Sequence, residues 1–301
     1  AMATTRHIWL NKVVSYGNQI DLRLEDYLAY LADDDRIRLI ACYVEDIKNV
    51  SGFLKTLKRT TARKPVLILK GGRTEQGSKA AASHTGAMAS NYTIWSSAVR
   101  QHGGLLVDDF DQLMNLAMLG TAKKLPGGRR VGFLGAGGGV SVLFADLAVS
   151  AGLELPELGP RTQQMINEKI RGVNTSTTNP VDLGAFGFDL NVMLHTMQAM
   201  DQDDNIDVII PYFDVEYLIQ AEMILQIKNS ADTIMKMAEG IRKPVIPVLI
   251  SFLENNLEAE RIRIDTFKSL RKAGFPVYGT IQEAVYVIET YFEWVEKRTH
   301  R

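Results

Sequence analysis

Short apolar runs alternate with longer amphipathic stretches along this chain of 301 residues. In the first half, strands are predicted at residues 12–15, 39–44, 66–69 and 105–107, and helices at 23–32, 50–60 and 92–101. In the second half, strands are predicted at 131–134, 181–183, 208–212, 245–249 and 277–278, and helices at 140–151, 160–169, 190–200, 219–239 and 257–273. Strands that alternate with helices in this way are typical of βαβ units. The pattern therefore predicts an α/β fold whose sheets are mostly parallel.

A polar segment rich in turn-forming residues, 123–129, lies near the middle of the chain and is interpreted as a linker. Domains commonly hold about 100–150 residues, so a chain of this length is expected to form two. We therefore predict a first domain at residues 1–124 and a second at 125–301.

The two halves resemble a divergent repeat. At residues 99–107 and again at 270–278, a helix stops at glycine and a strand follows. The second half opens with the strand 131–134, a glycine loop at 135–139 and a helix, whereas the first half has no equivalent before Lys12. We therefore expect the first domain to be incomplete at its N-terminal end, without its opening strand, its glycine loop and most of the helix that follows.

Composition narrows the classes of function. The formal net charge of −1, with 23% charged residues, gives no electrostatic basis for binding nucleic acid or an anionic membrane surface. The longest apolar run is far shorter than the roughly 18 residues of a membrane span. The single cysteine, Cys42, excludes an intramolecular disulfide and a cysteine-based metal cage, and it fits the reducing cytoplasm, where we expect the protein. No pair of histidines has metal-ligand spacing, so no metal site is predicted.

The strongest candidate for chemistry is His84, which follows a predicted buried strand in a loop of small residues. Ser83, Thr85 and Gly86 flank it and leave room for a bulky group, while Lys70 and Arg73 supply positive charge. Imidazole is nucleophilic near neutral pH because its unperturbed pKa is about 6.5. A lone histidine is more often structural, and on its own this one leaves metal, acid–base and phosphoryl roles open. The small and basic neighbours favour a phosphoryl acceptor.

Glu45 directly follows the predicted strand 39–44. Ligands of open α/β sheets bind at the carboxyl ends of the strands, and a carboxylate there can hold the second ring nitrogen of a histidine and stabilise its charged form. The alternative is an acidic side chain that simply faces solvent at a strand end. With no metal partner in view, Glu45 adds weight to phosphohistidine chemistry at His84.

The glycine loop 135–139 leaves a predicted strand and opens a helix. Backbone N–H groups at such a helix start, here those of Gly137, Gly138 and Gly139, favour a bound phosphate. The loop matches neither the dinucleotide fingerprint nor the Walker loop, and a tight turn without a ligand is the alternative. Asn179 and Asp182 lie in a later segment that either supports this loop or forms a turn before a strand.

Several of these segments occur together, in order, in one known family. They are Lys70 to Arg73 leading into Ser83-His84-Thr85-Gly86-Ala87, the residues 14–21, Tyr43-x-Glu45, the glycine loop, and Asn179-Pro180-x-Asp182. The chain resembles the NDP-forming acyl-CoA synthetases, relatives of succinyl-CoA synthetase and of the ADP-forming acetyl-CoA synthetase. The resemblance implies two flavodoxin-like, succinyl-CoA synthetase-like domains, phosphorylation of His84 during turnover, and Glu45 as the residue that orients it. It also implies phosphate binding at helix N-termini.

The resemblance implies the reversible reaction acyl-CoA + phosphate + NDP ⇌ acid + CoA + NTP, through an acyl phosphate and a phosphohistidine. CoA and ADP or ATP with Mg²⁺ would be substrates, with no tightly bound cofactor. Members of the family carry a CoA-binding domain and an ATP-grasp domain, in the same chain or in a partner subunit, and neither is identified in these residues. We expect this chain to be incomplete as an enzyme by itself and to form a homo- or hetero-oligomer. Met88 and Ser90 are mild departures from the family pattern.

Two alternatives remain open at this point. Related ligase-like regions occur fused to protein acetyltransferases, so the chain is alternatively a non-catalytic regulatory module that senses acyl-CoA or nucleotide. A plainer alternative is an interaction scaffold without chemistry of its own. The presence of both His84 and Glu45 favours the synthetase interpretation.

Overall fold

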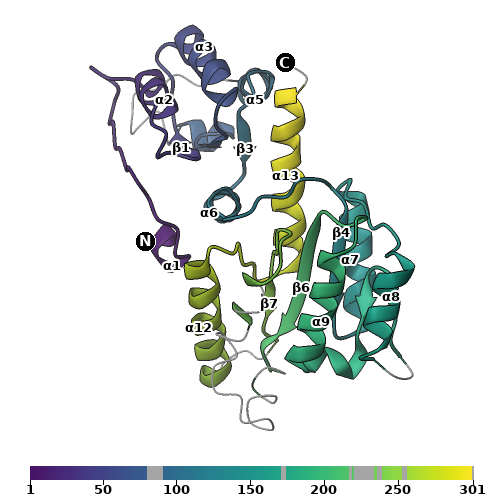
Figure 1. Ribbon diagram of the computed structural model, residues 1–301. Helices are drawn as coiled ribbons and strands as arrows, with labels where there is room; N and C mark the ends of the chain where they lie inside the picture. Colours follow the sequence, from purple (N-terminus) through teal and green to yellow (C-terminus); the bar gives the residue numbers. More distant parts are fainter. Residues whose placement is uncertain are drawn as a thin grey trace. The chain divides into compact units, whose positions relative to one another are not determined.

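A computed structural model describes residues 1–79, 91–170, 174–216, 219, 234–235, 239–252 and 256–299 of the chain (Figure 1). The chain folds into two compact units. The first comprises Ala1–Thr121 with Thr290–Arg301, and the second comprises Ala122–Glu289. The division of the sequence at residues 124 and 125 stays a prediction.

The first unit is built on a parallel sheet with the strand order β1-β2-β3. The strands are β1 (Ile40–Val44), β2 (Val66–Lys70) and β3 (Leu105–Val107). The helices are α1 (Met2–Thr5), α2 (Leu24–Ala32), α3 (Val50–Thr61), α5 (Tyr92–Gln101) and α6 (Phe110–Gly120). Asparagine and aspartate side chains cap the starts of α3, α5 and α6 by accepting backbone N–H groups, as such residues commonly do.

The core of the first unit lies between its sheet and its helices. Leu28 from α2, Phe53 and Leu57 from α3, and Val44 and Ile68 from the sheet are buried together in it. Every residue of β2 is buried, whereas β1 alternates buried and exposed positions. This difference follows from strand order, because β2 is central and β1 lies at the edge of the described sheet.

The predicted strand at residues 12–15 is wrong, because the structure has no strand there. Val13 is 78% exposed and Val14 is 42% exposed, and the described sheet ends at β1. Lys12 instead forms an ion pair with Asp34. Two β-branched residues favour an extended backbone, but a strand also needs a neighbour to hydrogen-bond with.

The second unit contains a four-stranded sheet with the order β5-β4-β6-β7, and all its pairings are parallel. The strands are β4 (Val131–Gly135), β5 (Val181–Asp182), β6 (Val208–Asp214) and β7 (Val248–Ile250). The helices are α7 (Gly138–Ser150), α8 (Pro160–Asn167), the 3-10 helix η1 (Gly184–Phe188), α9 (Leu190–Asp201) and α12 (Leu257–Ala273). Helix α13 (Ile281–Thr299) begins in this unit, and its residues from Thr290 onward belong to the first unit. Figure 1 shows β6 and β7 running between α9 and α12.

Two predicted elements of the second unit are shorter than expected. The strand predicted at 245–249 is reduced to β7, with Val245 forming only an isolated bridge to Ile209. The strand predicted at 277–278 is a single bridge between Tyr278 and Val248. Most of the helix predicted at 219–239 lies outside the described residues. Within the parts of the chain that the structure describes, every helix is too short or too polar to cross a membrane.

Candidate functional site

Charged residues gather at the carboxyl ends of the three strands of the first unit. Glu45 directly follows β1, Lys70 ends β2 and Asp108 directly follows β3. The parallel register pairs Val44 with Lys70 and Leu69 with Val107, so these ends lie at one edge of the sheet. Ligands of open parallel sheets bind at this edge, and this is also the edge from which the chain leaves β2 towards residue 84.

The four residues predicted around the phosphoryl group are consecutive in the sequence. Ser83, His84, Thr85 and Gly86 lie outside the residues that the structure describes. The structure thus locates the end of β2, which precedes them in the chain, and the side chains that surround that strand end. It leaves the role of His84 a prediction.

Lys70 links the end of β2 to the end of β1. Its ammonium group donates to the main-chain oxygen of Glu45 at 2.7 Å and to that of Gly71, and it lies 5.7 Å from the ring centre of Trp95. The residue is only 6% exposed, and burial lowers the pKa of Lys70 while the nearby carboxylates of Asp46 and Glu45 oppose that shift. The charge therefore holds the backbone of Glu45 in place.

The side chain of Glu45 has a partner that the sequence pattern did not bring forward. The Tyr43 hydroxyl lies 3.1 Å from Oε1 of Glu45. Side chains two residues apart on a strand share a face, and that spacing is the signal that could have indicated this pair. Tyr43, Glu45 and Lys70 thus form one connected group at the ends of two adjacent strands.

Arg73 is engaged by the residue that follows β3. Its guanidinium forms an ion pair with the Asp108 carboxylate at 2.5 Å and donates to the Asp108 main-chain oxygen at 2.6 Å. The same group lies 6.0 Å from the ring centre of Tyr92. Its charge is therefore balanced in the structure, and it joins the loop after β2 to the end of β3.

The glycine loop of the second unit joins β4 to α7. Gly137 stands at the N-cap of α7 with φ 118° and ψ 120°, a backbone conformation that side chains rarely adopt. The helix starts without a side-chain cap and without an acidic residue in its first turn, and Gly137, Gly138 and Gly139 are all exposed. A helix start of this kind presents N–H groups and the positive end of the helix dipole to an anion.

Asp182 and Asn179 are close in sequence but serve different parts of the second unit. The Asp182 carboxylate accepts the N–H groups of Gly137 and Gly184, both at 2.9 Å, so it shapes the glycine loop directly. The Asn179 amide donates to the main-chain oxygens of Val131 and Pro156 and accepts from the N–H of Phe133. The structure therefore brings Asp182 to the loop and places Asn179 further along β4, towards the start of that strand.

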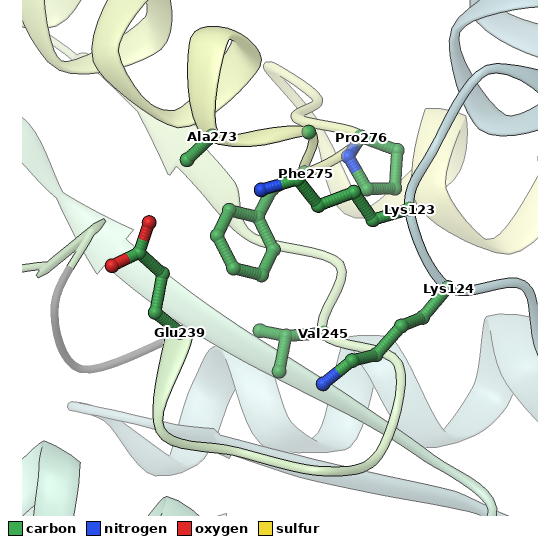
Figure 2. A pocket seen from close by; sticks show the side chains of 8 residues that line it. Lys123, Lys124, Glu239, Val245, Ala273, Phe275 and Pro276 are labelled. Atoms are coloured by element: carbon green, nitrogen blue, oxygen red, sulfur yellow. The ribbon is translucent and has the colours of Figure 1, made fainter.

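A small pocket of about 90 Å³ lies on the amino side of β7. Figure 2 shows the Phe275 ring between the side chains of Lys123 and Val245, with Glu239 at one side. Lys124 reaches the main-chain oxygen of Ile241 at 2.5 Å. None of the residues predicted for the site lines this pocket. Among the described residues, no group of three or more His, Cys, Asp or Glu side chains is placed to hold a metal ion.

Comparisons with known proteins place the chain in a family. Residues 1–119 match the family model of the succinyl-CoA ligase like flavodoxin domain. The alpha subunit of acetate–CoA ligase (ADP-forming) II of Pyrococcus furiosus is 37% identical over 205 residues, which is 67% of this chain and 44% of that protein. The chain belongs to the ADP-forming acyl-CoA synthetase family. Acetate–CoA ligase (ADP-forming) II of Archaeoglobus fulgidus is 28% identical over 309 residues, covering 99% of this chain and 42% of that protein.

A solved structure has the same fold. It is acetyl-coenzyme A synthetase 1 of Ca. Korarchaeum cryptofilum in complex with phosphate and ADP, with a TM-score of 0.80 at 23% identity over 99% of this chain and 62% of that one. The prediction of an α/β fold of the succinyl-CoA ligase type, with parallel sheets, is confirmed. The chain is related to NDP-forming acid–CoA ligases. The chain spans less than half the length of the two ligases named above.

Proposed function

We propose that this chain is the ligase core of an NDP-forming acyl-CoA synthetase, which interconverts acyl-CoA, phosphate and NDP with acid, CoA and NTP. The observation that carries the proposal is the group formed by Glu45 and Lys70 at the strand end from which the chain proceeds to His84. The relationship to ADP-forming acetate–CoA ligases supports the reaction class.

The proposed chemistry has three transfer steps. An oxygen of phosphate attacks the thioester carbonyl of acyl-CoA, and the CoA thiolate leaves as the acyl phosphate forms. A ring nitrogen of His84 then attacks phosphorus, and the carboxylate of the acid leaves with the bonding electrons of the broken P–O bond. Finally a terminal oxygen of the NDP attacks the phosphohistidine, which forms the NTP and returns the free imidazole. Every step is reversible.

Glu45 supports the second step in this proposal. As the first ring nitrogen of His84 takes the phosphoryl group, the imidazole gains positive charge. A carboxylate that accepts the N–H of the other ring nitrogen stabilises that charge and selects the reactive tautomer. Ser83, Thr85 and Gly86 are proposed to donate hydrogen bonds to the phosphoryl oxygens.

The start of α7 is proposed to bind a phosphate group through the N–H groups of Gly138 and Gly139, with Asp182 holding the loop in shape. Fixed donors of this kind stabilise the negative charge that spreads over the oxygens during phosphoryl transfer. We propose that a CoA-binding domain and an ATP-grasp domain act with this chain. One relative named above is a subunit alpha, which supports the involvement of a partner subunit.

The proposal is tested by looking for acid-labile, base-stable phosphate on His84. The intact natural protein, with any subunit that co-purifies, is incubated with γ-³²P-labelled ATP and Mg²⁺, and separately with ³²P-labelled acetyl phosphate. We expect labelling that His84→Ala abolishes and that Glu45→Gln slows. His102→Gln is the matched control, because the His102 ring contacts a nearby helix carbonyl, that of Ala98, through Nδ1. Labelling from neither donor, or labelling unchanged in His84→Ala, contradicts the proposal.

A further inference from the structure

Tyr43 and Glu45 project from the same face at the end of β1. The Tyr43 hydroxyl lies 3.1 Å from Oε1 of Glu45. Burial, and then the hydrogen bond to Glu45, raise the pKa of Tyr43 above its ordinary value. The phenol therefore keeps its proton near neutral pH and acts as the donor, while the carboxylate accepts.

Two further contacts fix the position of the Tyr43 ring. The ring stacks on Phe110, the first residue of α6, with centroids 5.7 Å apart and planes inclined by 29°. On another side the backbone of Gly71 passes close to the hydroxyl. A Cβ atom at position 71 would lie 2.7 Å from the Tyr43 hydroxyl oxygen, which is closer than real Cβ contacts allow. Glycine at this position therefore gives the hydroxyl the space in which it meets Glu45.

Both the backbone and the side chain of Glu45 are therefore held in place. Lys70 binds its main-chain oxygen at 2.7 Å, which sets the position of the backbone. Tyr43 binds Oε1, which sets the orientation of the carboxylate plane. A carboxylate fixed in this way can present its second oxygen in one direction without first losing rotamer freedom.

We propose that Tyr43 is a positioning residue that orients the Glu45 carboxylate towards the histidine it supports, with Gly71 providing the space for the tyrosine hydroxyl. The inference rests on the proposed function, because it assigns Tyr43 a part in phosphoryl transfer to His84. No proton moves to or from Tyr43 in the reaction. Its hydroxyl donates one hydrogen bond to Oε1 throughout.

The test measures the rate at which ³²P-labelled acetyl phosphate labels His84 in the intact protein. Tyr43→Phe keeps the ring that stacks on Phe110 and removes only the hydroxyl. Tyr43 is 47% exposed, so this bond lies at the weak end of hydrogen bonds to charged groups, and its loss predicts labelling about 10-fold slower at saturation. The KM for acetyl phosphate and the melting temperature are expected to stay unchanged. Tyr30→Phe is the matched control at wild-type rate, because Tyr30 is 58% exposed and far from Glu45 along the chain.

A double-mutant cycle separates positioning from a general structural effect. If Tyr43 acts through Glu45, then Tyr43→Phe should slow the Glu45→Gln enzyme by less than twofold. Gly71→Ala perturbs the same group from the other side, because its methyl group would lie 2.7 Å from the Tyr43 hydroxyl oxygen, although it also comes within 3.3 Å of Cγ of Glu45. It is expected to slow labelling in the wild-type background by more than it does in the Tyr43→Phe background.

The outcomes distinguish this inference from the function on which it rests. Wild-type protein whose His84 is never labelled overturns both. Wild-type labelling that Tyr43→Phe changes by less than twofold overturns the role of Tyr43 alone. The role of Tyr43 is also overturned if the rate losses of Tyr43→Phe and Glu45→Gln multiply fully in the double variant. It is overturned as well if Tyr43→Phe changes only the KM.

Discussion

Asn179→Ala should destabilise the second unit even though the side chain is only partly buried. The Asn179 amide bridges three backbone groups. Nδ2 donates to the oxygens of Val131 at 2.6 Å and Pro156 at 3.1 Å, and Oδ1 accepts the N–H of Phe133 at 3.1 Å. Val131 and Phe133 are 0% exposed, so water has little access to replace the lost partners. Alanine leaves all three backbone groups without this amide.

The expected cost follows from these contacts. A buried polar group left without a partner costs about 1–3 kcal/mol. The two groups on β4, the Val131 oxygen and the Phe133 N–H, therefore predict a loss of roughly 2–4 kcal/mol after partial relaxation. Asn179→Asp keeps the acceptor but replaces the donor with an oxygen that faces two backbone oxygens, so it should be destabilising as well.

Hydrogen exchange at the amides of β4 is the appropriate measurement, because two units of one chain need not unfold together and exchange reports each separately. The matched control is Asn205→Ala, since Asn205 is exposed and its side chain makes one bond, to the Glu157 oxygen at 3.0 Å. We expect the control to change the free energy of opening by less than about 1 kcal/mol. If Asn179→Ala alters that free energy by no more than the control does, Asn179 does not hold β4 in the way described.

Two further predictions concern the second unit. Gly137→Ala should lower the free energy of unfolding by about 1–3 kcal/mol, because a φ of 118° strains any residue with a side chain. The control Gly139→Ala should be neutral or slightly stabilising in thermal unfolding, because its added Cβ meets nothing within 4 Å. Equal effects of the two variants would contradict backbone strain at Gly137. Hydrogen bonds from Arg130 lower the pKa of Asp207 in the folded protein. The ionised Asp207 carboxylate therefore stabilises the fold at a pH above the pKa of an unfolded aspartate, and this stabilisation is lost as the pH falls through the lower pKa of the folded state. The stability deficit of Asp207→Asn should therefore shrink between pH 7 and pH 3, and a deficit independent of pH would contradict this.

The sequence pattern predicted the strands where burial decides the structure. β1 and β2 are apolar runs that enter the core, and the structure places them within one residue of the predicted ranges. The run at 12–15 has the same local character but lacks a neighbouring strand, and Lys12 pairs with Asp34 instead. Pairing depends on chain far away in sequence, which a local pattern does not contain.

The candidate site was predictable in its location more than in its contacts. The rule that ligands bind at the carboxyl ends of parallel strands predicts the edge at which Glu45 and Asp182 lie. It does not indicate that the Asn179 amide hydrogen-bonds to the backbone of β4, or that Tyr43 and Gly71 pack beside the Glu45 carboxylate. The contacts of Asn179 with β4 and of Gly71 with Tyr43 join residues far apart in the sequence, so they follow from packing. Only the pairing of Tyr43 with Glu45 has a signal in the sequence, which is their spacing of two residues.

The cations of the first unit have partners that limit what they can do for a phosphoryl group. Lys70 donates to two main-chain oxygens and is 6% exposed, and Arg73 is paired with the Asp108 carboxylate. A charge already balanced by a carboxylate contributes little additional field at a third group. In the proposed function Lys70 and Arg73 therefore hold the ends of the strands in position. Stabilisation of the phosphoryl oxygens in that proposal then depends chiefly on backbone N–H groups, which bind such oxygens without a charged side chain.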